Sequence, residues 1–237
     1  MARLGLARHV FVCRDEGYIV VLDLKQDRYF ALDAAKTAPL SLVLPGWPTS
    51  PAGEALPESA IAQAVAPLVR QGWLLEGEAE SKDATPVNTV IPERELTVEA
   101  DRAEDKVGLG AVIAFVTASI FAKFALRFWR FERVIRRVAD RNAKHAAAPT
   151  TPFDIERARK LVHAFTRLRA FLFSTKEECL HDSLSMLEFL ARHQLFPSWV
   201  FAVRARPFAA HCWVQHDGVV FNDTVEHVSS YVPIMVV

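Results

Sequence analysis

A change of composition near residue 77 constrains the fold of this chain more than any other sequence feature. Residues 77–105 read GEAESKDATPVNTVIPERELTVEADRAED, a polar and acidic stretch that contains prolines. Such a stretch offers few side chains to a core, and domain boundaries usually fall in segments of this kind. The sequence therefore predicts two domains, at residues 1–78 and 106–237, joined by a linker at 79–105.

The remaining composition is typical of a globular protein. The 237 residues are 51% hydrophobic, enough to bury a substantial core. Acidic and basic residues balance at 28 each, so no nucleic acid partner is expected, because nucleic acids usually require a basic surface. The three cysteines, Cys13, Cys179 and Cys212, are widely spaced. They suit a reducing cytoplasm better than a disulfide framework, and we expect a cytoplasmic protein.

The first 78 residues are predicted to form a small α+β unit. Residues 17–33, GYIVVLDLKQDRYFALD, place two β-rich runs around a polar turn at 25–27, which predicts a hairpin. Asp33 can then cap a short helix. Apolar residues at helical spacing predict a longer helix at about 57–71, after which residues 73–75 return as a short strand.

One segment is apolar enough to raise the question of a membrane. Val107 to Leu126 reads VGLGAVIAFVTASIFAKFAL and includes Lys123. It is only marginally long enough, since spanning a bilayer takes roughly 20 predominantly apolar residues. We expect a buried helix, with a membrane-associated helix as the alternative. The arginines of the basic stretch 127–141 are interpreted as a solvated helix face, and another helix is expected at about 153–173.

The first candidate catalytic residue is Cys179. The segment from Ser174 reads STKEECLHDSLSMLEFLARH, and two overlapping capping boxes, Ser174 with Glu177 and Thr175 with Glu178, predict a helix start. Cys179 would lie near the positive end of the helix dipole, which favours the thiolate that a nucleophile needs. The alternative is that Cys179 is a small buried hydrophobic residue.

A predicted hairpin supplies a histidine and an acid. Residues 207–224, PFAAHCWVQHDGVVFNDT, contain two β-rich runs around residues 216–218. If those three residues form the loop, the register pairs His211 with Asp223, and directly opposed residues share one face of a sheet. A loop shorter by one residue would slip the register and set His211 beside Thr224.

Together these residues match the needs of a cysteine protease. Its histidine accepts and returns a proton, while an acid orients the imidazole. We therefore assign Cys179, His211 and Asp223 as the candidate catalytic residues. Strand alternation points Cys212 away from His211, so we interpret Cys212 as a core thiol outside the site. The remaining histidines show no metal-ligand spacing, and neither a metal nor another cofactor is expected.

These residues resemble a known family. The C-terminal half is similar to the transglutaminase-like (papain-like) cysteine protease of lasso-peptide biosynthesis, the B protein. The resemblance rests on ECLHDSLSMLEFLARH around Cys179, His-x-Trp-Val at 211–214, and the Asp-Gly turn before Asp223. It implies that Cys179 is the nucleophile, His211 the general base and acid, and Asp223 the orienting carboxylate. The N-terminal domain resembles the winged-helix-like recognition element of enzymes that process ribosomally made peptides.

The resemblance implies removal of the leader from a ribosomal precursor peptide. The leader would add as a strand to the edge of the N-terminal sheet, with the second helix as the other wall. The candidate leader-binding residues are Tyr29, Phe30, Leu32, Ile61, Val65 and Leu68. The alternative for each is an ordinary core position. The cut would free the core peptide for a partner, an ATP-dependent lasso cyclase resembling asparagine synthetase.

Two other functions stay open at this stage. One is an acyltransferase on the same scaffold, in which an amine rather than water resolves the acyl-enzyme. The other is a non-catalytic protein that binds the leader and delivers it to another enzyme.

Overall fold

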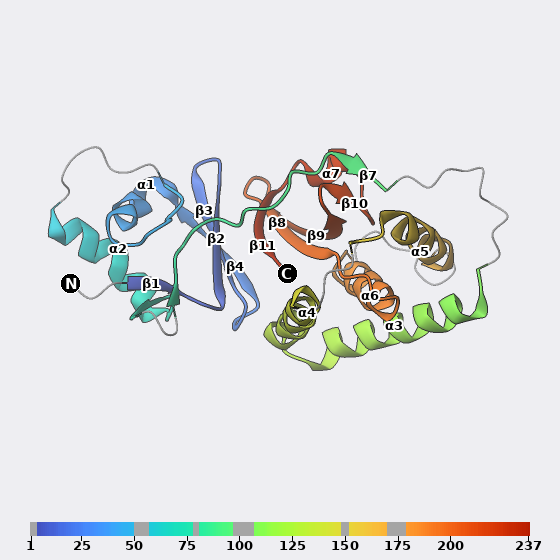
Figure 1. Cartoon of the computed structure of the whole chain (residues 1–237). Coiled ribbons are helices and arrows are strands. Elements are labelled where there is room, and N and C mark those ends of the chain that lie inside the picture. The colour runs from blue at the N-terminus through green and yellow to red at the C-terminus, as the bar shows by residue number, and fades with distance from the viewer. Residues whose placement is uncertain (1–3, 50–56, 78–80, 97–106, 148–151, 170–178) are drawn as a thin grey trace. The chain divides into compact units, whose positions relative to one another are not determined.

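The computed structural model describes residues 4–49, 57–77, 81–96, 107–147, 152–169 and 179–237 (Figure 1). Contacts divide the chain into two compact units. The first comprises residues 1–89, 202–210 and 232–235, and the second comprises residues 90–201, 211–231 and 236–237. Helices and several sheets make this a mixed α/β protein.

An antiparallel sheet of β2 (Val10–Asp15), β3 (Tyr18–Asp23) and β4 (Arg28–Asp33) begins the first unit, in the order β2-β3-β4. Pairing from Tyr18 with Asp33 to Asp23 with Arg28 confirms the predicted hairpin. Asp23 stabilises the turn, because one of its carboxylate oxygens accepts hydrogen bonds from two backbone N–H groups of the turn. β2 and β4 are the edge strands of this sheet.

Helices follow directly. Asp33 caps α1 (Ala34–Thr37) as predicted, since its carboxylate accepts hydrogen bonds from two N–H groups of the first turn. A 3₁₀ helix, η1 (Ala38–Leu42), continues from it. α2 (Glu58–Arg70) is the predicted longer helix and begins directly after Pro57, an accepted position for a residue without an N–H group.

A second small sheet completes the first unit. β1 (Leu4–Ala7) pairs antiparallel with β5 (Leu74–Glu76) on one side and with β6 (Ser81–Lys82) on the other. β6 lies in the expected linker, so part of that segment is paired. The core contains a buried carboxylate, Asp23, which accepts a hydrogen bond of 2.9 Å from Nε1 of Trp73.

A five-stranded sheet runs in the order β11-β8-β9-β10-β7. Its strands are β7 (Arg94–Glu95), β8 (Ser198–Arg204), β9 (Ala209–His216), β10 (Val219–Val220) and β11 (Val232–Val236). β7 is a second piece of the expected linker and pairs parallel with β10. A short helix, α7 (Val225–Val228), lies between β10 and β11 in the chain.

The central helix of the second unit is α6 (Cys179–Arg192), in which every residue from Asp182 to Leu190 is buried. Both α3 (Leu109–Phe128) and α5 (Ile155–Arg169) pack against it, and α4 (Phe131–Ala146) follows α3 (Figure 1). The capping boxes at 174–178, which predicted the start of this helix, lie outside the described residues.

The prediction of a buried helix at Val107–Leu126 is wrong for one face of α3. Small residues form the buried face, with Ala118, Ala122 and Ala125 fully covered, and they let α6 approach closely. The opposite stripe is exposed and apolar; it comprises Leu109, Ile113, Val116, Ile120, Phe124 and Phe128. By length and composition α3 is long and apolar enough to cross a membrane, with 33% of its most apolar window buried.

The basic stretch also differs from its prediction at one residue. Only 20% of the Arg141 side chain is exposed, and its guanidinium contacts the buried carboxylate of Glu188 at 2.7 Å. Arg192, one turn along α6, donates to the backbone carbonyl of Glu188 at 2.7 Å. A buried carboxylate needs such partners because desolvation of an isolated charge is costly. This ion pair therefore ties α4 to α6, the helix that carries Cys179.

Candidate active site

Cys179 is the first described residue of α6 and is half-buried. Its pKa is lowered to about 4, first by a hydrogen bond with the Cys212 thiol. Burial opposes this shift, while a hydrogen bond with His211, the charge of that ring and the backbone of Cys212 reinforce it. Cys179 is therefore a thiolate at neutral pH, the form that acts as a nucleophile.

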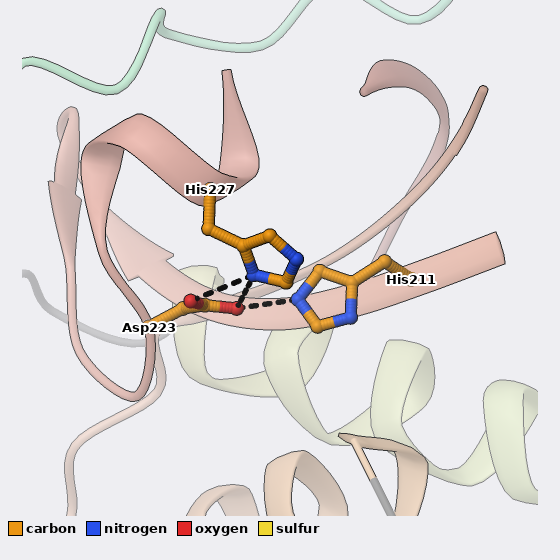
Figure 2. Close-up of side chains that lie close together, drawn as sticks. All are labelled: His211, Asp223 and His227. Carbon is orange, nitrogen blue, oxygen red and sulfur yellow. Dashed lines mark hydrogen bonds and ion pairs between the residues drawn. The ribbon is translucent and has the colours of Figure 1, made fainter. Parts of the chain in front are cut away.

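His211 lies on β9 and joins the nucleophile to an acid. Its Nε2 atom is 2.5 Å from Oδ2 of Asp223 (Figure 2), which leaves Nδ1 for the hydrogen bond with Cys179. Burial acts to lower the pKa of His211, but the bonds with Asp223 and Cys179 outweigh it and raise the pKa to about 9. At neutral pH the imidazole is protonated beside the Cys179 thiolate.

Asp223 reaches His211 by a route that the sequence did not reveal. The turn before β10 has two residues, Asp217 and Gly218, with φ of 44° and 75°, as a type I′ hairpin requires. Val219 pairs with His216, so the predicted three-residue loop is wrong and the slipped register is the real one. Continued pairing in that register would have set Thr224, rather than Asp223, opposite His211.

The ladder ends before that point because a side chain takes the place of the backbone. Oδ1 of Asn222 accepts the hydrogen bond of the Val214 N–H group at 2.8 Å. Nδ2 of Asn222 donates to Oδ2 of Asp182 at 3.0 Å and to Oγ of Ser183 at 3.1 Å. Asn222 thus holds the departing chain against α6, and the next residue, Asp223, turns to His211.

Asp223 has a second histidine partner, His227. Nδ1 of His227 lies 3.0 Å from each carboxylate oxygen of Asp223 (Figure 2), and the Thr224 N–H group donates to Oδ1 at 2.7 Å. Burial acts to raise the pKa of Asp223, but these bonds and that of His211 lower it overall. The carboxylate therefore stays ionised and fixes the orientation of the His211 ring.

Sequence reasoning missed His227, although its signal was local. Asp223 and His227 are four residues apart across the start of α7, and Thr224 caps that helix by accepting the His227 N–H group at 3.2 Å. Residues at this spacing share a helix face. A helix-capping threonine that follows an acid and precedes a histidine by three residues therefore indicates that the acid and the histidine can bond.

Cys212 lies closer to the Cys179 sulfur than the sequence predicted. Cys212 is a core thiol as predicted, with 3% of its surface exposed, but the prediction that it lies outside the site is wrong, because its thiol hydrogen-bonds Cys179. The Cys179 sulfur also accepts a backbone hydrogen bond from Cys212. Because the sulfur lies this close to the strand backbone, side chains from both faces of β9 reach it.

The same cluster contains a possible set of metal ligands. One ligand atom from each of His211, Asp223 and His227 lies within 4.8 Å of the others. Two imidazoles and a carboxylate are a set that zinc accepts, and histidine spacing in the sequence did not predict it. In the described structure each of the three groups is already hydrogen-bonded within the cluster.

The six candidate leader-binding residues do not meet in one described cavity. Phe30 and Leu32, on the edge strand β4, pack against the core of the first unit, as does Val65 on α2. Leu68 is 5% exposed, a core position. Ile61 and Val65 line a cavity of about 270 Å³ that no residue of β4 lines.

A thiolate in the first described turn of α6, a histidine on a strand and an aspartate bonded to that histidine are the set of groups that cysteine peptidases and acyltransferases use. The chain belongs to the transglutaminase-like superfamily, whose sequence profile matches residues 118–236, half of its length. Proteins of this superfamily are usually cysteine peptidases or acyltransferases. No curated protein and no solved structure matches the chain. The matched region excludes residues 1–117, so the winged-helix-like recognition domain stays a prediction.

Proposed function

We propose that this protein is a cysteine peptidase that removes the leader from a ribosomally made precursor peptide of the lasso type. One observation carries the catalytic part: the ring of His211 bonds to Cys179 and, through Nε2, to Asp223. This is the arrangement of nucleophile, base and orienting acid that acyl transfer to a thiol requires.

The reaction follows from the charges in the site. The Cys179 thiolate attacks the carbonyl carbon of the scissile peptide bond, and the protonated His211 gives its proton to the leaving amine. A thioester joins the leader to Cys179. Neutral His211 then takes a proton from water, the hydroxide displaces Cys179, and the leader leaves with a free carboxylate. Asp223 keeps the ring oriented throughout.

The recognition part rests on the first unit. β4 is an edge strand, and edge strands accept an additional strand through unpaired backbone groups. The cavity along α2 is mostly apolar, with Ile61 and Val65 in its wall and Glu58 and Glu76 also lining it, and it would accept a side chain of the leader. A protein with these two features fits an extended peptide that carries spaced apolar side chains.

The proposed setting is a pathway in the cytoplasm. The released core peptide would pass to an ATP-dependent cyclase that resembles asparagine synthetase, and this chain itself would use no cofactor. The lasso assignment comes from the resemblance of the motifs around Cys179 and His211, and superfamily membership is consistent with it.

An acyltransferase is the second candidate, because transglutaminase-like enzymes of both types use one nucleophile. The two differ only in whether water or an amine resolves the thioester. A leader-delivery protein without activity would have no need for the lowered pKa of Cys179, about 4, or for the His211–Asp223 pair.

The experiment is incubation of the full chain with the precursor peptide encoded beside its gene, followed by mass spectrometry. A peptidase yields a leader with a free carboxylate and a core peptide with a free amine. Addition of a primary amine separates the alternatives, because an acyltransferase would yield leader amide instead. The matched controls are Cys179→Ala, expected to be inactive, and Cys13→Ala, expected to be active. Intact precursor in the presence of folded wild-type protein would defeat the peptidase proposal.

A further inference from the structure

A second thiol lies beside the nucleophile, although the proposed reaction gives it no role. Cys212 is 3% exposed and its thiol hydrogen-bonds the Cys179 sulfur. A peptidase mechanism needs one cysteine, a histidine and an acid, all of which are present without it. The position of Cys212 is therefore unexplained by peptide cleavage.

The two cysteines are held together by contacts between α6 and β9. Ser183 follows Cys179 by four residues, so both lie on one face of α6. Its hydroxyl donates to the backbone carbonyl of Cys212 at 3.2 Å, and the Cys212 thiol donates to the Ser183 hydroxyl oxygen at 3.8 Å. Asn222 adds a hydrogen bond of 3.1 Å to this hydroxyl. The strand and the helix are thereby fixed where the two sulfurs meet.

The two thiols differ in what can reach them. Cys179 is half-buried, so a small oxidant can enter and react with it. Cys212 is 3% exposed, so oxidants in solvent meet no accessible sulfur there. Cys212 can therefore react only with a group delivered by its neighbour.

We propose that Cys179 and Cys212 form a reversible disulfide when the protein meets a hydroperoxide, with Cys179 as the oxidised cysteine and Cys212 as the resolving one. The Cys179 thiolate attacks the terminal peroxide oxygen and the O–O bond breaks, which gives a sulfenic acid and releases hydroxide from hydrogen peroxide or an alkoxide from an organic hydroperoxide. The Cys212 sulfur then attacks the sulfur of Cys179, the S–O bond breaks, and water leaves with the proton of Cys212. The peroxide gains two electrons, one from each sulfur.

The consequence is protection of the nucleophile. A sulfenic acid that meets no second thiol can be oxidised further to sulfinic acid, which dithiols do not reverse. Condensation with Cys212 traps the reversible state, and a dithiol reductant regenerates both thiols. This inference goes beyond peptide cleavage and holds whichever bond Cys179 cuts.

The test uses the full chain treated with hydrogen peroxide and then alkylated without reduction. Trypsin should release residues 177–192 and 205–237 as one disulfide-linked pair, because no cleavable site separates either cysteine from the rest of its peptide. Two of the three thiols should disappear, and Cys13 should remain. Dithiothreitol should restore the iodoacetamide reactivity of Cys179 in full. None of these readings requires a substrate, so they stand apart from the proposed function.

The comparison of two variants sharpens the result. Cys13→Ala, which removes the cysteine remote from the site, should form the same linked pair. Cys212→Ala should form none, and its Cys179 should proceed to sulfinic acid that dithiothreitol cannot recover. Wild-type protein that yields Cys179 sulfinic acid without the linked pair would overturn the proposal. So would a Cys212→Ala protein that recovers as completely as the wild type.

Discussion

Nδ1 of His227 lies 3.0 Å from both carboxylate oxygens of Asp223, so the acid that orients His211 is itself held by a second histidine. The rings of His211 and His227 are 4.7 Å apart between centroids. An ionised carboxylate that accepts several hydrogen bonds is fixed in position and in charge. His227 is therefore a positioning residue, since it acts on the reaction only through Asp223.

Replacement of His227 should weaken catalysis through Asp223. In His227→Ala the carboxylate loses a hydrogen bond that lowers its pKa, so that pKa should rise toward the acid limb of kcat/KM, which ionisation of Cys179 sets at about pH 4. Because the reaction would then need two groups to ionise in that range, the acid limb should move to higher pH. We expect a fall of about tenfold in kcat with an almost unchanged KM, in the range seen for loss of one supporting hydrogen bond.

The control is Glu226→Ala, an exposed neighbour on α7, which should leave the pH profile unchanged. A purely structural role of His227 would lower stability without moving the acid limb. That pattern, measured by thermal unfolding together with the pH profile, would argue against positioning.

The pKa values of Cys179 and His211 set the working range of the enzyme. The thiolate exists above the pKa of Cys179, about 4, and the imidazole is protonated below the pKa of His211, about 9. Because both charged forms are needed for attack and for protonation of the leaving amine, kcat/KM should be bell-shaped between those limits. A profile that rises only above pH 8, where an ordinary thiol ionises, would contradict the ion pair.

The same pair can be tested without substrate by the rate of alkylation with iodoacetamide. The hydrogen bond from Cys212 stabilises the charged form of Cys179, so Cys212→Ala should raise the pKa of Cys179 and move the alkylation curve to higher pH. Cys13, whose pKa burial raises to about 12, should stay unreactive in the folded protein and serves as the internal reference. An unchanged curve in Cys212→Ala would show that the neighbouring thiol has no effect on ionisation.

Local chemistry made much of the fold predictable. The cap by Asp33, the hairpin of β3 and β4, and the helix after Pro57 all depend on residues within a few positions of one another. Backbone preferences decide such features, so they can be read from the chain. The three candidate catalytic residues named from the sequence also come together in the structure, although the register that predicted the meeting of His211 and Asp223 is wrong.

Contacts between side chains that are far apart in the chain could not be predicted from the sequence. The end of β10 depends on Asn222 bonding to Asp182 and Ser183, some 40 residues away. The same holds for Arg141, which pairs with Glu188 47 residues later instead of facing water. In both cases a side chain finds its partner through tertiary packing, which no periodicity encodes.

Asn222 provides a direct test of how Asp223 is placed. The structure gives Asn222 one backbone and two side-chain partners. Asn222→Ala should lower the free energy of unfolding by roughly 1–3 kcal/mol, since buried polar groups lose their partners. It should also lower kcat, because Asp223 would no longer be turned toward His211.

Asp223→Asn is the companion measurement. It should reduce turnover by orders of magnitude with little loss of stability or of precursor binding, as expected when the orienting acid is lost. Urea denaturation and turnover, measured on both variants, distinguish the structural role of Asn222 from the role of Asp223 in orienting His211. Equal stability of Asn222→Ala and wild type would contradict the inference that Asn222 holds the chain after β10 against α6.

The last prediction concerns the cavity along α2 and rests on the proposed leader binding. Ile61 lines this cavity of about 270 Å³ together with Val65, whereas Gln63 is exposed on another part of the same helix. Ile61→Glu would add a carboxylate to the apolar part of this cavity, which Glu58 and Glu76 also line, and an incoming apolar side chain would have to desolvate it. We expect Ile61→Glu to weaken leader binding about tenfold or more, and Gln63→Glu, which also adds one negative charge to α2, to leave it unchanged.

Fluorescence anisotropy of a labelled leader, with Cys179→Ala as the background to prevent cleavage, measures both affinities. Circular dichroism should first show that both variants are folded; equal affinities would then place the leader elsewhere on the protein.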